Sequence, residues 1–117
     1  MDNAILNKSK AFAIRIIRLY QYLKDEKKEF VLSKQLLRSG TSIGANCREA
    51  YRAQSPADFT AKLGIALKEA EESAYWLELL AETDYLSTEQ FRSIYADSEE
   101  LIKLLVSIIK TTKLHNS

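Results

Sequence analysis

A helical spacing of apolar residues, repeated four times, is the feature that most restricts the fold of this chain. In each of four stretches, apolar or small residues return every three or four positions, which places them on one face of an α-helix. Only three glycines and one proline occur in 117 residues, and a β-rich protein of this size needs more turn-forming residues. The pattern therefore predicts an all-α protein made of four amphipathic helices.

The first two helices are expected over Ile5–Lys24 and Lys34–Ala53. We expect Ser33 to cap the second helix, because its hydroxyl can accept from the unpaired first-turn amides. Gly40 and Gly44 lie one helical turn apart in this helix, so together they leave room for another helix backbone to come close. A weak helix or a loop around these glycines is the alternative.

Capping sequences mark the other two helices. Before Pro56–Glu82, Ser55 can cap, proline occupies the first helical position, and Asp58 completes a capping box. The run 87–90, Ser-Thr-Glu-Gln, repeats the box and starts a fourth helix, whose apolar seam continues to Ile109. The tail from Thr111 to Ser117 is expected to fray.

Short connections determine how these helices are arranged. Links of a few residues force neighbouring helices to be antiparallel, and helices of about 20 residues match in length, at about 30 Å. The sequence therefore predicts an antiparallel up-down-up-down four-helix bundle, with residues 1–117 forming one domain.

Several classes of function are disfavoured. No apolar run approaches the roughly 20 residues that span a bilayer, so no membrane partner is expected. Cys47 is the only cysteine and cannot form an internal disulfide, which favours a cytoplasmic location. It lies on the small-residue face of the second helix, where it is expected to fill space. His115 is the only histidine and lies in the polar tail, and the Glu-x-x-His motif of di-iron bundles is absent. We expect no catalytic residue, metal or cofactor.

Charge is unevenly distributed along the chain. The formal net charge is +1, but residues 69–100 hold ten acidic side chains and one arginine, whereas residues 1–68 are basic. Ordinary solvated helix faces would explain this pattern. Alternatively, a basic and an acidic surface meet each other across copies, or meet an anionic ligand.

Polar residues of the second and third helices are expected to lie opposite one another. If the chain turns at Gln54–Ser55, Arg38 faces Glu71 and Glu72, and Arg52 faces Asp58. These contacts are either surface ion pairs, each contributing about 0 to 1 kcal/mol, or part of a partly buried polar layer at a helix–helix or subunit contact. Apolar neighbours favour the layer, which would contain Ser42, Asn46, Glu49, Glu69 and Glu72.

Three segments, Leu37–Ala50, Asp58–Ala70 and Ser73–Leu80, resemble the bacterial family of 23S rRNA intervening-sequence proteins. The resemblance implies a left-handed four-helix bundle and, as in known relatives, a ring-shaped homopentamer. A related branch serves as the accessory protein of diversity-generating retroelements, so the resemblance also implies nucleic acid as a partner, and a reverse transcriptase if this chain belongs to that branch. It implies no established activity for the family at large.

A short signature carries this resemblance at the residue level. The family's Ser-Ile-x-x-Asn-x-x-Glu pattern falls on Ser42, Ile43, Asn46 and Glu49. Many relatives have glycine after the glutamate, whereas this chain has Ala50. That difference fits one subgroup of the family better than it fits the retroelement branch.

Two functional hypotheses remain from the sequence. The first is a non-enzymatic oligomer that binds nucleic acid through a basic set: Arg38, Arg48, Arg52, Lys62 and Lys68. The second is a protein-interaction or scaffold module without nucleic acid, which the modest isoelectric point of about 7.8 favours. Both predict self-association, because five apolar residues lie off the helix seams: Ile14, Ile17, Ile65, Trp76 and Leu79.

Overall fold

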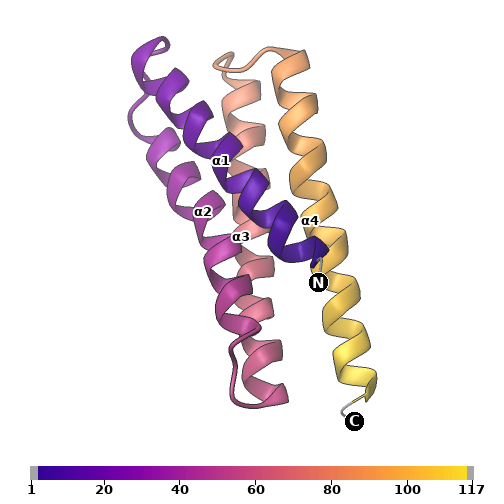
Figure 1. Cartoon of the computed structure of the whole chain (residues 1–117). Coiled ribbons are helices and arrows are strands. Elements are labelled where there is room, and N and C mark those ends of the chain that lie inside the picture. Colours follow the sequence, from indigo (N-terminus) through magenta and orange to yellow (C-terminus); the bar gives the residue numbers. More distant parts are fainter. Residues whose placement is uncertain (1–2, 116–117) are drawn as a thin grey trace.

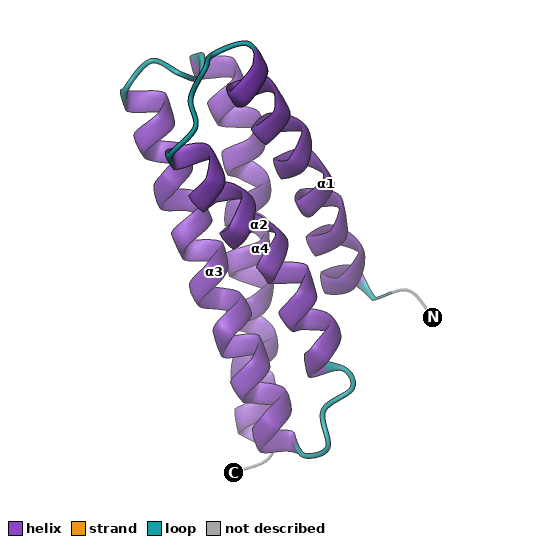
Figure 2. Ribbon diagram, turned by 90° about the vertical axis from the view of Figure 1, so that its left-hand side faces the viewer, coloured by secondary structure: helices purple, strands orange, loops and turns teal. Residues whose placement is uncertain are grey.

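Four helices make up nearly all of the part of the chain that the computed structural model describes, residues 3–115 (Figure 1). They are α1 (Ala4–Asp25), α2 (Leu32–Ala50), α3 (Pro56–Glu82) and α4 (Thr88–His115). Each helix runs opposite to the one before it. The α1–α2 and α3–α4 connections therefore share one end of the bundle, called here the paired-loop end. The α2–α3 connection and the C-terminus of α4 lie at the other, the single-loop end (Figure 2). The predicted all-α, four-helix architecture is confirmed.

The boundaries of α2 and α4 differ from the prediction. α2 ends at Ala50, three residues early, because the ring of Tyr51 packs edge-on against Phe59 at 5.1 Å and turns the chain toward α3. α4 continues through His115, so the prediction that the chain frays from Thr111 is wrong for residues 111–115. Partly buried Ile108 and Ile109 pack against the core and hold these last turns in place. Residues 116 and 117 of the predicted tail lie outside the described residues.

A glutamate caps α2, and the prediction for Ser33 is wrong. Glu29 is buried, and its carboxylate accepts from the backbone N–H groups of Val31, Leu32 and Ser33 at 3.1, 3.0 and 2.7 Å. Ser33 lies inside the helix, where its hydroxyl donates to the Glu29 carbonyl at 2.9 Å. Burial alone disfavours the charged carboxylate, but the three amide hydrogen bonds outweigh it and lower the pKa of Glu29.

The cap of α4 follows the sequence prediction in full, whereas at α3 only the Ser55 half of the predicted capping box forms among the described residues. The Ser55 hydroxyl accepts from the Asp58 amide at 3.1 Å. At α4 the box is reciprocal: the backbone N–H of Gln90 donates to the Ser87 hydroxyl, and the backbone N–H of Ser87 donates to the side-chain oxygen of Gln90. Both starts are therefore fixed by local hydrogen bonds.

The seams of all four helices meet in a single core. Its largest fully buried side chains include Phe12 and Ile16 of α1, Ile43 of α2 and Leu77 of α3. The buried hydroxyls of Ser39 on α2 and Ser73 on α3 form a hydrogen bond of 2.8 Å between the two helices. Buried hydroxyls are costly when unpaired, so this pair favours one alignment of the two helices.

The small-residue face of α2 packs against α1, as close approach requires. A Cβ atom placed on Gly40 would lie 2.8 Å from two side-chain carbons of Ile16, and one on Gly44 would lie 3.3 Å from the Ser9 hydroxyl. Gly40 therefore cannot gain a side chain unless α1 moves. Gly64 of α3 differs, because a Cβ there would meet no atom within 4 Å.

Replacing Glu29 with alanine should remove the α2 cap and lower the free energy of unfolding by about 1 kcal/mol at pH 7. Because the pKa of Glu29 is lowered in the folded state, its charge stabilises the fold above the ordinary value of 4.5. That contribution is lost as pH falls through the folded-state pKa. Urea unfolding of Glu29→Ala and the parent should therefore differ less at pH 3 than at pH 7. Exposed Glu26→Ala is the control, and an equal difference at both pH values would contradict the capping role.

Alanine at Gly40 and alanine at Gly64 should change the stability in opposite directions. Gly40→Ala should destabilise the protein by about 1 to 3 kcal/mol, because the new methyl group collides with Ile16. Gly64→Ala should stabilise the helix by about 0.5 to 1 kcal/mol, since the methyl group enters open space and alanine is the better helix former. Chemical denaturation of the dilute protein measures both effects. Stabilisation by Gly40→Ala would disprove the close approach of α1 and α2.

Candidate interaction surfaces

The one cysteine is not placed as a nucleophile. Cys47 is fully buried in the core, and burial raises the pKa of its thiol to about 11 despite a hydrogen bond with Ser9. The thiolate that nucleophilic chemistry needs is therefore scarce near neutral pH. Within residues 3–115, no group of three or more histidine, cysteine or acidic residues could hold a metal ion. None of the helices in this range is long and apolar enough to cross a bilayer.

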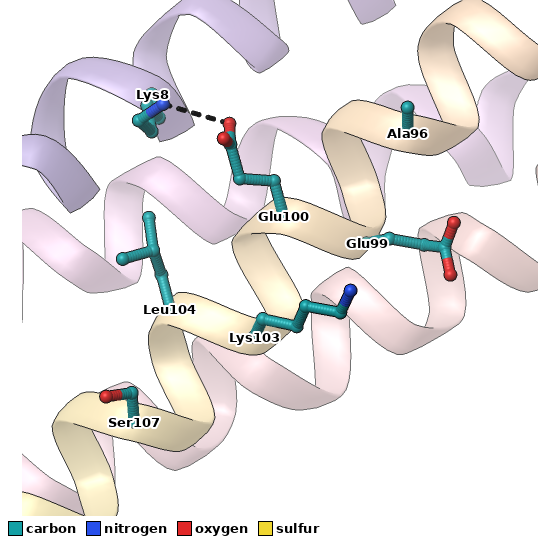
Figure 3. A pocket seen from close by; sticks show the side chains of 7 residues that line it. All are labelled: Lys8, Ala96, Glu99, Glu100, Lys103, Leu104 and Ser107. Atoms are coloured by element: carbon teal, nitrogen blue, oxygen red, sulfur yellow. Dashed lines mark hydrogen bonds and ion pairs between the residues drawn. The ribbon is translucent and has the colours of Figure 1, made fainter.

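A shallow hollow between the start of α1 and the middle of α4 is lined largely by charged side chains. It has a volume of about 570 Å³, and Figure 3 shows Lys8 of α1 bound to Glu100 of α4, at 3.0 Å. Glu99 and Lys103 lie one helical turn apart on the same helix and also line the hollow. The charges are mixed, and the largest apolar side chain in the lining is Leu104.

The predicted polar contact between α2 and α3 forms around Arg38. Its guanidinium binds Glu72 at 2.6 Å and Glu69 at 3.2 Å, and the Trp76 indole donates to the same Glu72 carboxylate oxygen. The prediction of Glu72 is confirmed, but the second partner is Glu69 and not Glu71. Glu69 lies one further turn along the face of α3 that turns toward α2, whereas Glu71 points to solvent.

The remaining members of the predicted polar layer do not join this contact. The Ser42 hydroxyl donates to the Arg38 carbonyl, and the Asn46 side chain donates to the Ser42 carbonyl, both within α2. Glu49 is exposed and lies 3.6 Å from Lys62. The five residues thus divide among the Arg38 cluster, local hydrogen bonds along α2 and a separate ion pair between Glu49 and Lys62 of α3.

The predicted basic set is partly neutralised. Arg38 and Lys62 are paired with acids, whereas no carboxylate in the described range forms an ion pair with the side chain of Arg48, Arg52 or Lys68. The expected Arg52–Asp58 pair does not form, although both residues line one hollow of about 440 Å³ together with Lys62.

Sequence analysis missed one cation beside Arg48. Lys10 of α1 and Arg48 of α2 line a hollow of about 350 Å³ that contains no acidic residue. The antiparallel pairing of the first two helices could have indicated this neighbour, because Ser9 lies against Gly44, one turn before Arg48.

Charged residues are segregated along the long axis of the bundle as well as between helices. The half toward the single-loop end comprises residues 4–13, 42–68 and 102–115, and has two acidic residues, Glu49 and Asp58. The half toward the paired-loop end comprises residues 14–41 and 69–101, and has eight cations and thirteen acids. Antiparallel packing thus brings the basic C-terminal part of α4 beside the basic part of α3, which in turn packs against the basic part of α2. The cations of the single-loop half are Lys8, Lys10, Arg48, Arg52, Lys62, Lys68, Lys103, Lys110 and Lys113.

Exposed apolar side chains lie on opposite sides of the bundle. Ile14 and Ile17 on α1 and Ile65 on α3 are exposed, as predicted. Trp76 and Leu79 are partly buried, and Trp76 packs against the core. The neighbouring Tyr75 points outward in their place, with 54% of its surface exposed.

The profile of the family described as 23S rRNA-intervening sequence protein matches residues 1–107. The chain belongs to this family. A crystal structure of a protein of unknown function from the S23 ribosomal protein family, from Bacteroides thetaiotaomicron VPI-5482, is 63% identical to it. That similarity covers 91% of this chain and 98% of the other, with a TM-score of 0.90. None of the curated proteins matches the chain.

Membership of the 23S rRNA-intervening sequence protein family supports the fold more directly than the function. The family description refers to an intervening sequence of rRNA, and the Bacteroides relative is described as having unknown function. The function of this family member must therefore be argued from its surfaces.

Proposed function

We propose that this protein is a non-enzymatic homo-oligomer, a ring of five copies in the cytoplasm, that binds RNA or DNA through its basic surface. The observation that carries the proposal is the charge of the single-loop half, nine cations against two acids. A polyanion gains from such a surface chiefly by releasing its condensed counterions. One copy has a modest surplus of charge, and a ring multiplies it.

The structure modifies which residues support this proposal. Arg38 binds two acids of α3, so it is a poor candidate for phosphate contact. Arg48 and Arg52 have no such partner within the described chain, and Lys10 lies beside Arg48. Basic residues near the end of α4, Lys110 and Lys113, belong to the same half of the bundle. Nucleic acid is therefore expected across the single-loop end.

At the single-loop end, the protein is expected to contact the phosphates of a nucleic acid and not its base edges. Tyr51 and Phe59 are its aromatic residues near Arg52, but they pack edge to face against each other. Tyr51 is 43% exposed, but one exposed ring does not supply the succession of stacking surfaces that sequence-tolerant single-strand binders use. Weak sequence selectivity is expected.

A protein-interaction module without nucleic acid is the second candidate. It is favoured by the pairing of Arg38 and Lys62 with acids and by the exposed isoleucines of α1 and α3. In that case the charged surfaces would serve assembly alone.

Fluorescence anisotropy with labelled oligonucleotides at about 50 mM salt separates the two candidates. Binding should be similar across sequences and weaken steeply with salt, and Arg48→Glu/Arg52→Glu should lower affinity at least tenfold. Lys27→Glu/Lys34→Glu changes net charge equally at the paired-loop end, so it is the matched control and should have a much smaller effect. Absence of binding by an intact oligomer would support the protein-interaction module.

Self-association has its own measurement. Light scattering coupled to size exclusion should give about five times the 13.4 kDa chain mass at micromolar concentration, because the exposed isoleucines need a partner surface. A mass equal to one chain would refute the oligomer.

A further inference from the structure

Two outward faces of the bundle expose large apolar side chains. Ile14 and Ile17 of α1 are 44% and 41% exposed, and Ile65 and Tyr75 of α3 are 44% and 54% exposed. α1 and α3 do not contact each other, since each packs between α2 and α4. Their outer faces therefore lie on opposite sides of the molecule (Figures 1 and 2).

The two faces lie at similar heights along the bundle. Ile16 packs on Gly40 of α2, and Arg38, two residues before Gly40, binds Glu69 and Glu72 of α3. This chain of contacts places Ile14 and Ile17 level with the stretch of α3 between Ile65 and Tyr75.

Charges beside the two faces are complementary toward the paired-loop end, whereas Lys10 of α1 and Lys68 of α3, both exposed and at similar heights, are like charges. Arg18 of α1 is exposed without an ion pair in the described chain, and Lys24 is paired only with its neighbour Asp25, at 3.8 Å. On α3, Glu71 and Glu82 are exposed and likewise lack an ion pair within residues 3–115. Antiparallel pairing through α2 puts Arg18 near the height of Glu71 and Lys24 near that of Glu82. Two copies set side by side in the same direction would bring opposite charges together.

Gly64 gives α3 a low surface next to Ile65. Glycine inside a helix costs about 1 kcal/mol relative to alanine, and no atom of this chain occupies the space beside it. Packing within the bundle therefore does not require glycine here. A second molecule that packs closely against the outer face of α3 would explain why this position has no side chain.

We propose that the outer face of α1 in one copy packs against the outer face of α3 in the next, with the two bundles parallel. This inference rests on the proposed self-association and specifies its contact: Ile14, Ile17 and Arg18 against Ile65, Glu71 and Tyr75. The two surfaces differ, so each pair leaves one α1 face and one α3 face open, and association continues until a ring closes. All basic single-loop ends then lie on the same rim of that ring.

Charge reversal on each face tests this pairing, with mass read by light scattering. Arg18→Glu/Lys24→Glu and Glu71→Lys/Glu82→Lys should each lose at least tenfold in association and shift toward the single-chain mass. Mixing the two variants should restore association between unlike copies, because the reversed α1 face of one then meets the reversed α3 face of the other. Unlike copies must alternate, and alternation cannot close a ring of five, so the mixture should run well above the single-chain mass without reproducing the parental mass. Combining all four substitutions in one chain should restore the parental oligomer. Arg92→Glu/Lys103→Glu on α4 is the matched control and should assemble like the parent.

The possible failures are distinguishable. If the parent is an oligomer and neither face variant changes its mass, the α1–α3 pairing is wrong although self-association stands. Loss of assembly that neither mixing nor the four-site variant restores, in variants whose circular dichroism shows a folded bundle, also overturns the pairing. A parent that runs as a single chain overturns the self-association on which the pairing rests.

Discussion

The close contact between Gly40 and Ile16 is the constraint on which the rest of the structure depends. One turn of α2 contacts both neighbouring helices. Gly40 packs against Ile16 of α1, whereas Arg38 and Ser39 form hydrogen bonds with α3. The contact with α1 is steric and tolerates no side chain, whereas the contacts with α3 are polar and directional. Together they fix the heights of α1 and α3 relative to each other, although those two helices never meet.

This fixed alignment turns a pattern along the sequence into a pattern in space. Residues 69–100 are acidic in the sequence, but α3 and α4 each pass through both halves of the bundle. Their acidic parts lie toward the paired-loop end, and their basic parts, which include Lys62 and Lys110, lie in the same single-loop half as Arg48 and Arg52. A net charge of only +1 over the whole chain thus becomes a local surplus of cations.

Much of the fold was predictable because its determinants are local. Helical spacing gave the four elements, and the capping residues Ser55 and Ser87 gave the starts of α3 and α4 to the residue. The start of α2 was missed because its cap comes from Glu29, a residue outside the usual capping types and four positions before Ser33. Local signals could not reveal this carboxylate, whose role depends on a folded connection that buries it.

The surfaces were less predictable, because they depend on which helix faces which. Arg38 was correctly placed opposite Glu72, but a uniform antiparallel register could not distinguish Glu69 from Glu71 as its second partner. The small-residue pattern indicates that some helix packs closely on Gly44 but does not say which one. The position of Lys10 beside Arg48 follows only once that helix is known to be α1. Tyr75 and Trp76 are adjacent, and only the rotation of α3 in the bundle decides which of them faces solvent.

We propose that a polyanion binds at the single-loop end, and hydrogen exchange measured by mass spectrometry, with and without a saturating oligonucleotide, tests this proposal. Exchange should slow in peptides spanning residues 48–62 and 103–115, with little change around residues 24–34 and 82–90. Protection confined to the paired-loop end, or no protection under conditions where the oligonucleotide is bound, would contradict it.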